Sequence, residues 1–405
     1  MKTNHIILYG SKDNLNLKGI LNKNEVFKED LGGGFTANTS GIQVESPFKI
    51  GVENITDFQA MELKLDPEVA DVFQTMPLCL IEPLNVQEDI QAAANSNTWG
   101  IEAVGAHSSK FTGHGIKVAV LDTGIDASHP AFAGLNITPQ NFTSESGADI
   151  HGHGTHCAGT IFGRDVDGMR IGIARGVQDV FIGKVLGKGS GDVGNLINAI
   201  NEAVDFGAHI ISMSLDIDFP GKVEELRLLY PKRNPKEITS MALNLYRKNV
   251  SYLEKHIAYI RAKTGDPKRG PVIIVAAAGN ESDRPDSRLS VSPPAVSEGF
   301  ISVGALGFNL GQYSVARFSN SEPTLSGPGV DVISARRGGG LKSMDGTSMA
   351  TPHVAGVAAL WAEHFKIQGQ FNYQMFSAKI LTSCSTDLLQ NEMASDYGAG
   401  IVQAP

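Results

Sequence analysis

The feature that most constrains the fold is a series of short apolar runs that alternate with helical stretches from Trp99 onward. Continuous apolar runs of about four to eight residues are typical of parallel strands that are buried on both faces. Parallel neighbours need long crossovers, and residues 194–208 have the length and apolar spacing of a crossover helix. We therefore predict an α/β fold with a doubly wound, mostly parallel sheet. The predicted strands are KVAVLD, DVFIGKVL, AHIISMSL, VIIVAAAG, FISVGAL and VDVISA.

A different pattern precedes this sheet. HIILYG, FQAMELKL and LCLIEPL have the composition of strands, and DPEVADVFQTM is predicted to form a helix with Asp66 as N-cap. LGGGFTANTSG is predicted to be a flexible loop by composition. We predict a small α+β domain over 1–90, a polar linker over 91–98 and a larger domain over 99–405.

A helical insertion interrupts the larger domain at about 217–271. Its second half has apolar residues at helical spacing, and the segment is basic. Two interpretations stay open, namely a solvated helix face, or a docking surface for an acidic peptide or for the N-terminal unit. The basic residues are Arg227, Lys232, Arg233, Lys236, Arg247, Lys248, Arg261, Lys268 and Arg269.

Composition and charge exclude several classes of function. A net charge of -9 argues against nucleic-acid binding, which needs a basic face. No apolar run reaches the roughly 18 residues of a membrane span, and Ile6–Tyr9 is shorter than a signal-peptide core of about 7–15 residues. The three cysteines give no disulfide framework, which agrees with a reducing compartment. We expect a cytoplasmic protein with no nucleic-acid or membrane partner.

Four motifs carry groups with potential chemistry, and catalytic groups gather at the carboxyl ends of parallel strands. Asp122 ends KVAVLD, three histidines lie in HGHGTHCAG, Asn280 ends VIIVAAAGN, and Ser348 is predicted at a helix start with Pro352 in its first turn. Taken singly, each fits a turn or a helix cap. Taken together, they supply a nucleophile, a base, a carboxylate to orient the base, and a donor for a developing oxyanion.

The motifs VLDTGID, HGTHCAG, AAAGN and GTSMATPHVAG resemble the signatures of the subtilisin (subtilase) family of serine proteases, in the family's order. The resemblance covers about residue 99 to the C-terminus and implies a subtilisin-like sheet and a serine endopeptidase with an acyl-enzyme intermediate. By position, Asp122 orients the imidazole, His153 is the general base, and Ser348 is the nucleophile. Asn280 and the Ser348 backbone N–H then form the oxyanion hole.

The resemblance also implies how partners bind. Ser214 and Leu215 match the strand that pairs with an extended substrate, and Ala278 and Gly279 match a wall of the first specificity pocket. Residues 1–90 resemble the family's inhibitory propeptide. This implies a self-processing zymogen that is cut somewhere in about 84–98, with peptide or protein substrates and its own propeptide as partners.

The chain departs from the family pattern at two places. Asp216 stands where the family usually has glycine, which suggests a preference for Lys or Arg at a nearby substrate position. Ala131 stands where the family often has an aspartate calcium ligand, and the loop that contains Asp165 and Asp167 also differs. Asp165 and Asp167 could still bind an ion, but we do not predict the usual calcium site, and we name no metal or cofactor for the chain.

Two rival functions remain to be tested. One is a metal hydrolase that uses His151, His153 and His156 as ligands, and the other is a catalytically latent, peptide-binding protein on the subtilase fold. Cys157, four residues after the predicted base, is expected to be a small buried hydrophobe, with a redox-sensitive position as the alternative.

Overall fold

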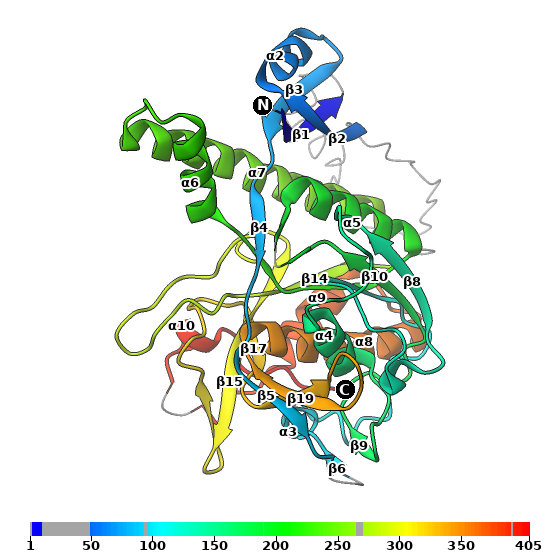
Figure 1. Ribbon diagram of the computed structural model, residues 1–405. Helices are drawn as coiled ribbons and strands as arrows, with labels where there is room; N and C mark the ends of the chain where they lie inside the picture. The colour runs from blue at the N-terminus through cyan, green and yellow to red at the C-terminus, as the bar shows by residue number, and fades with distance from the viewer. Residues whose placement is uncertain (1, 10–48, 93–95, 189, 265–269, 390–391) are drawn as a thin grey trace, which may run out of the picture.

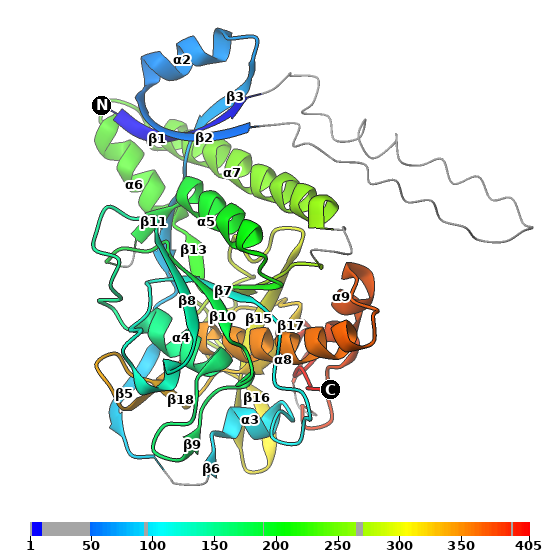
Figure 2. The same ribbon diagram turned by 90° about the vertical axis from the view of Figure 1, so that its right-hand side faces the viewer.

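The computed structural model describes residues 2–9, 49–92, 96–188, 190–264, 270–389 and 392–405. A central sheet lies between two layers of helices, and a small N-terminal unit stacks on one of these layers (Figures 1 and 2). Among the helices in these ranges, none is both long and apolar enough to cross a membrane.

The central sheet has the strand order β16-β15-β14-β12-β7-β10-β8, and β17 also pairs with β15. Every neighbouring pair is parallel except β15–β16, which confirms the predicted doubly wound α/β class. The strands are β7 (Val118–Asp122), β8 (Asn136–Asn141), β10 (Asp179–Lys184), β12 (Ile210–Met213), β14 (Ile273–Ala277), β15 (Phe300–Asn309), β16 (Gln312–Val315) and β17 (Leu325–Pro328).

Helices cover both faces of this sheet, which explains why its strands are apolar throughout. Alternate residues of β7 enter opposite cores: Val118 and Val120 pack on the side of α4 (His153–Phe162) and α8 (Thr347–Ile367). Ala119 and Leu121 pack on the side of α5 (Val193–Phe206) and α7 (Pro235–Thr264). A strand buried on both faces has no solvent side on which polar residues would be favoured.

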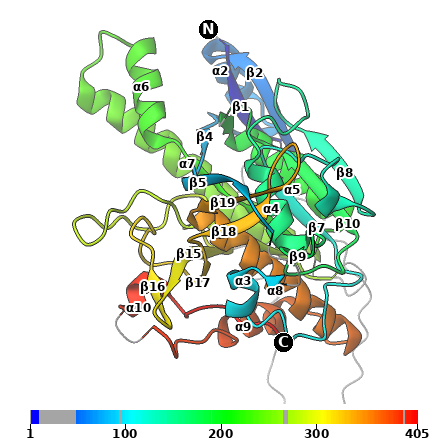
Figure 3. The ribbon, with the colours of Figure 1, turned by 60° about the horizontal axis from the view of Figure 1, so that its bottom comes forward.

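The run VDVISA does not belong to the central sheet, so that part of the prediction was wrong. It forms β18 (Val332–Ala335), which pairs antiparallel with β19 (Leu341–Asp345) in a three-stranded sheet of order β18-β19-β5, where β5 spans Leu84–Ile90 (Figure 3). Three glycines with positive φ, 338–340, reverse the chain between β18 and β19 and so favour a hairpin. The remaining elements are α3 (Trp99–Ala103), α9 (Tyr373–Thr382), α10 (Ala394–Tyr397), a 3₁₀ turn at Pro130–Phe132, β6 (Ser96–Asn97) and β9 (Met169–Arg170).

The N-terminal unit is α+β as predicted, but one helix and one strand are exchanged. FQAMELKL lies in helix α2 (Asp57–Leu65), and DPEVADVFQTM contains strand β3 (Val69–Gln74). Thr56 and Gln59 form a capping box that starts α2, and Asp66 ends that helix instead of starting the next. The strands β1 (Lys2–Tyr9), β2 (Lys49–Thr56) and β3 form a sheet of order β2-β1-β3. The predicted loop at 31–41 lies outside the described residues.

The insertion forms α6 (Phe219–Leu229) and the 30-residue helix α7, and the N-terminal unit rests on α7. Phe73 packs edge-on against Tyr252 with ring centroids 6.0 Å apart, and Lys248 pairs with Asp71 at 3.0 Å. Of the two interpretations of this basic segment, these contacts support a docking surface for the N-terminal unit.

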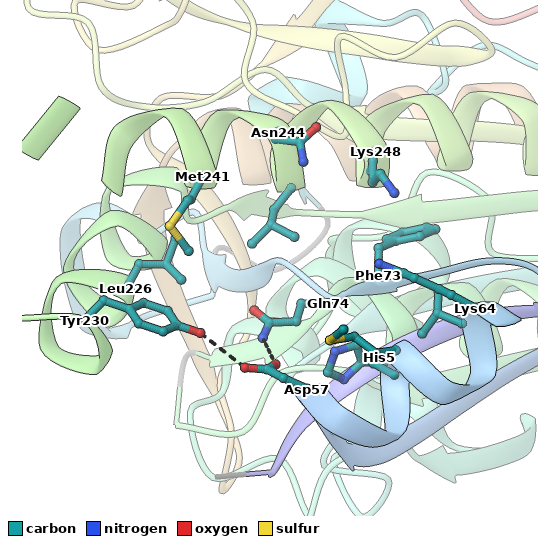
Figure 4. Close-up of a pocket in the computed structure, with 14 residues that line it drawn as sticks. His5, Asp57, Lys64, Phe73, Gln74, Leu226, Tyr230, Met241, Asn244 and Lys248 are labelled. Carbon is teal, nitrogen blue, oxygen red and sulfur yellow. Dashed lines mark hydrogen bonds between the residues drawn. The ribbon is translucent and has the colours of Figure 1, made fainter. Parts of the chain in front are cut away.

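A crevice remains between α2 and the insertion helices, and a hydrogen bond joins its two sides (Figure 4). Tyr230 donates to Asp57 at 3.2 Å across its mouth. Met61 of α2 and Met241 of α7 contribute apolar surface to its walls. The crevice therefore belongs to the interface between the N-terminal unit and the insertion.

Asn249, a fully buried residue of α7, holds the segment that leaves the N-terminal unit. Its Oδ1 accepts from Met76 N at 3.1 Å, and its Nδ2 donates to Gln74 O at 3.0 Å. A buried backbone N–H that loses its acceptor costs about 1–3 kcal/mol.

We predict that Asn249→Ala, made in a Ser348→Ala background that prevents self-cleavage, lowers the free energy of unfolding by about 1–3 kcal/mol. The N–H of Met76 would otherwise be buried without an acceptor. Denaturant titration measures the change, and Asn244→Ala, at an exposed position of α7, is the matched control. Equal stabilities of the two variants would contradict the view that Asn249 holds this segment.

Candidate active site

A segment of the chain itself lies in the predicted substrate cleft. Strand β4 (Pro77–Leu80) runs antiparallel between β11 (Ser190–Asp192) and β13 (Leu215–Ile217). Leu80 faces Leu215 and Cys79 faces Asp216, so the strand predicted to bind substrate is occupied by a peptide in the extended mode of strand addition. Figure 1 shows β4 descending from the N-terminal unit to the centre of the molecule.

The predicted acid–base pair is assembled at the carboxyl end of β7. Asp122 is the last residue of β7 and His153 is the first of α4, after Gly152 with a φ of 89°. Asp122 Oδ1 lies 2.8 Å from His153 Nδ1, and both side chains are buried. This contact fixes Nδ1 as the protonated nitrogen and leaves Nε2 as the nitrogen that can take a proton.

A second carboxylate, Asp149, connects the two halves of this pair. It accepts hydrogen bonds from the N–H groups of His151, Gly152 and Thr155 and from the hydroxyls of Thr123 and Thr155, at 2.6 to 3.1 Å. Burial by itself raises the pKa of Asp149. The hydrogen-bond donors lower the pKa by a larger amount, so it lies below the usual range. Asp149 thus ties the start of α4 to Thr123, the neighbour of Asp122.

The environment of His153 favours its protonated form. Burial lowers the pKa of His153, but the Asp122 carboxylate outweighs it, and the pKa lies well above the ordinary value of 6.5. Within the described part of the chain, His153 Nε2 has no hydrogen-bond partner. The His153 ring is therefore oriented by Asp122 but makes no hydrogen bond with Ser348.

Ser348 is the second residue of α8 and is fully buried. Pro352 lies in the second turn of α8, not in the first turn as predicted. Because proline has no N–H, the Ser348 carbonyl loses its usual helical donor. It accepts instead from Cys157 Sγ at 3.4 Å and Ser214 Oγ at 3.5 Å.

Asn280 lies beside Ser348 with its amide oriented. Its Oδ1 accepts from Thr347 N at 2.9 Å and Thr347 Oγ1 at 2.8 Å, which directs Nδ2 toward the cleft. There Nδ2 donates to Glu82 O at 2.9 Å. The arrangement suits an oxyanion donor, whose N–H must already point at the developing charge.

The serine and the asparagine contact two consecutive carbonyls of the bound segment. Ser348 Oγ donates to Ile81 O at 3.1 Å, whereas Asn280 Nδ2 donates to the next carbonyl, Glu82 O. Pro83 follows immediately. Neither carbonyl receives both groups, so the segment is bound in a register that does not favour attack.

Of the remaining predicted binding residues, Asp216 pairs with Cys79 of β4, and Ala278 and Gly279 follow strand β14. Gly279 has a φ of 112°, and a Cβ there would fall 2.2 Å from Asn320 Nδ2, so only glycine fits. Ala278 is fully buried next to it. Burial and the neighbouring Glu281 raise the pKa of Asp216 to about 7, and one of its oxygens has no partner among the described residues.

The three histidines of HGHGTHCAG do not form a metal site. Burial lowers the pKa of His156 to about 3, and its Nε2 lies 3.1 Å from Val332 O, so a neutral ring donates to the backbone. Among the described residues, the potential metal ligands that lie within 4.8 Å of one another are Asp122, His153 and Cys157. His153 Nδ1 already binds Asp122, which leaves no three-histidine set.

The positions related to the family's calcium loop are also poorly suited to an ion. Ala131 is buried and offers no side-chain oxygen. The Asp165 carboxylate pairs with Arg175 at 3.0 Å. These residues do not fit a calcium site, and no step of the chemistry below is derived from one.

Cys157 is buried beneath the reactive groups, as predicted. Its Sγ lies 3.8 Å from His153 Nδ1, and burial raises the pKa of this thiol. It packs with Val332, Met344 and Met349 as a small apolar side chain.

Comparison with known proteins agrees with this geometry. The model of the Subtilase family matches residues 113–400. The chain belongs to the subtilase family. It is accordingly a serine endopeptidase, as the motifs predicted.

Particular relatives extend the comparison. The chain is 35% identical to an intracellular serine protease of Paenibacillus polymyxa over 64% of this chain and 71% of that protein. It is 30% identical to M-protease of Shouchella clausii over 88% of this chain and 82% of that protein. The crystal structure of fervidolysin from Fervidobacterium pennivorans, a keratinolytic enzyme related to subtilisin, superposes with a TM-score of 0.64 and 21% identity. It covers 100% of this chain, which spans 60% of that protein.

Two features of the site were not predicted from the sequence. Asp149 had one available signal, since it lies two residues before the HGHGTHCAG motif and four before His153. The propeptide resemblance was a signal that this segment crosses the cleft, but the register that places Ile81 and Glu82 there had none, because it depends on how residues far apart in the chain pair.

We predict that Asp149→Asn lowers kcat about 10- to 100-fold with little change in KM, because His153 is then poorly aligned. Steady-state kinetics on one peptide measures both constants. Asp126→Asn, which removes a carboxylate of the neighbouring loop, is the control and is expected to retain activity. A change confined to KM would contradict the positioning role.

Proposed function

We propose that this subtilase hydrolyses peptide bonds with Asp122, His153 and Ser348 as its triad and Asn280 as the oxyanion donor. The 2.8 Å contact of the Asp122 and His153 side chains, in a cleft where Ser348 and Asn280 both touch a bound peptide, carries the proposal. Leu215 and its neighbours hold the substrate by strand pairing.

The proposed chemistry follows from the positions of these atoms. Ser348 Oγ attacks the substrate carbonyl carbon while His153 Nε2 takes the hydroxyl proton, and the carbonyl oxygen becomes an oxyanion bound by Asn280 and the Ser348 N–H. His153 then gives the proton to the leaving amine, which leaves an acyl-enzyme. A water molecule, deprotonated by His153, releases the acid. Asp122 stabilises the imidazolium formed in both steps.

We further propose that the intact chain is a latent zymogen and that its first ninety or so residues act as the inhibitor. The bound segment supports this, since Ile81 meets the serine while Glu82 meets the oxyanion donor. Attack at Glu82 would also have to expel the nitrogen of Pro83, which is a ring nitrogen. The unit of 1–90 would act through 77–90, with 99–405 as the catalytic domain and the final cut in about 84–98.

An intracellular location is proposed on narrower grounds. The relative from Paenibacillus polymyxa is named an intracellular serine protease. The three cysteines of this chain are free.

The proposed function is tested with Ser348→Ala. We expect it to lower kcat on a peptide by about a millionfold, the size known for the triad serine of a subtilisin. Retained binding of 77–90 without any peptide cleavage by the native protein would favour the rival, a latent peptide-binding protein.

The pH dependence tests the role of His153. Only neutral His153 can accept a proton, and its pKa is raised, so kcat/KM is expected to rise with pH through an apparent pKa above 6.5 and to be lost below it. Asp122→Asn is expected to shift this limb to lower pH and to lower kcat by about 10⁴-fold. If kcat/KM rose over the same pH range in that variant as in the native protein, the assignment of His153 as the base would be contradicted.

Latency is tested at Pro83. We predict that Pro83→Ala speeds the appearance of fragments from purified full-length chain at least about tenfold, because the amide at this position can then be cleaved. Gel analysis over time measures the rate, and the double variant with Ser348→Ala shows whether the cut is the protein's own. An unchanged rate would mean that proline does not block the bond.

Asp216 is tested with peptides that vary at the position of Cys79, two residues before the carbonyl that meets Ser348. Lys or Arg at this position is expected to be preferred over Leu about threefold or more, because a partly buried carboxylate gains from an opposite charge. Asp216→Asn is expected to remove the preference and to spare the Leu peptide. Equal rates for all three side chains in the native protein would refute the hypothesis.

A further inference from the structure

The bound segment continues past Ser348 along the outer edge of β19. In β5, Leu84 faces Asp345, Gln87 faces Ser343 and Ile90 faces Leu341. Because β19 leads through Gly346 into Ser348, this edge lies where a substrate's residues C-terminal to the cut would run. When β5 leaves, the edge of β19 is open to another extended chain.

Three cationic side chains and one histidine lie around this edge, and we call them the basic ledge: Arg336, Arg337, Lys342 and His151. A Cβ placed on Gly152 would lie 3.2 Å from Arg337 Cβ and 3.5 Å from Lys342 Nζ, so these two side chains approach the same point. Figure 3 shows β5, β18 and β19 together at this side of the molecule.

The chain's own segment places acidic side chains on the basic ledge. Arg336 donates to Asp89 Oδ1 and lies 4.0 Å from Glu88 Oε2. His151 Nε2 lies 3.4 Å from Glu82 Oε2. The acidic residues of 82–89 are Glu82, Glu88 and Asp89, and each of them approaches a residue of the basic ledge.

Neighbouring carboxylates of the catalytic domain are already engaged. Asp149 is buried under five hydrogen bonds, and Asp126 accepts from Gly338 N at 2.8 Å. Among the described residues, the acidic partners of Arg336 both belong to β5. Departure of β5 therefore leaves the positive charge of Arg336 without an acidic partner in this part of the chain.

We propose that the basic ledge selects substrates with acidic side chains C-terminal to the cut, four and five residues beyond the residue that pairs with Asp345. This inference rests on the proposed peptidase function. Pairing with β19 fixes the backbone, and complementary charge decides which side chains are favoured there. Asp216 thus lies on the side of Ser348 before the cut, and the basic ledge lies on the side after it.

The test uses two quenched fluorescent peptides that differ only at these two positions, Glu-Asp against Gln-Asn. The purified full-length chain is left to process until its activity is constant, and active sites are counted with a fluorophosphonate. We expect kcat/KM to be about three- to fivefold higher for the acidic peptide at low salt, the size of two partly exposed ion pairs. At about 1 M salt, where screening acts within about 3 Å, the ratio is expected to approach one.

Variants separate charge recognition from folding. Arg336→Gln is expected to remove the preference while the Gln-Asn peptide is cleaved as before, and Arg336→Glu is expected to favour a Lys-Lys peptide. Arg175→Gln is the matched control, because Arg175 is an exposed arginine paired with one carboxylate near the amino end of the sheet. It is expected to keep the preference.

The outcomes are distinguishable. Cleavage of both peptides at equal rates, at low salt, overturns the basic ledge and leaves the proposed function intact. A preparation that cleaves no peptide and is not labelled at Ser348 overturns the proposed function, and this inference with it.

Discussion

The pairing of β4 between β11 and β13 is the interaction that determines how the chain's own segment occupies the cleft. It sets which residue faces Asp216 and so which carbonyl reaches Ser348. Asn249 fixes one end of the segment at Met76, and β19 holds the other end through Leu84. Between these two anchors, Ile81, Glu82 and Pro83 have little freedom to shift. Contacts on both sides of the cleft thus keep Ser348 on the Ile81 carbonyl and Asn280 on the next carbonyl, that of Glu82.

The catalytic groups are held independently of this segment. Asp122, Thr123 and Asp149 join the end of β7 to the start of α4 through buried hydrogen bonds, none of which involves the bound segment. Thr347 orients the Asn280 amide in the same way. What separates the observed state from an engaged one is the direction of the Ser348 hydroxyl, which points to Ile81. Because the other groups are already in place, the proposed mechanism requires only that the bound segment leave the cleft.

Much of this could be predicted from the sequence, because it is local or repetitive. Continuous apolar runs marked the parallel strands, and the motifs around Asp122, His153 and Ser348 placed each group at an element end. The wrong predictions arose where a stretch of sequence fits more than one local pattern. FQAMELKL has a partial alternation, yet the capping box at Thr56 and Gln59 starts a helix whose Phe58 and Met61 face solvent. VDVISA is as apolar as its neighbours, and only its pairing partner excludes it from the main sheet.

The insertion and the basic ledge place charge at opposite ends of the same segment. Lys248 meets Asp71 before the cleft, and Arg336 meets Asp89 after it. Asp216, with a pKa of about 7, lies between them. Charged side chains placed in this way favour one direction and one register for a chain bound in the cleft.

The most direct test of this account is the rate at which a fluorophosphonate labels Ser348 in the intact chain of 43.1 kDa and in its processed fragments. Because Ile81 covers a fully buried Ser348, the account predicts slow labelling of the intact chain and rapid labelling of fragments that lack the N-terminal unit. Labelling of the intact chain as fast as that of the fragments would contradict it.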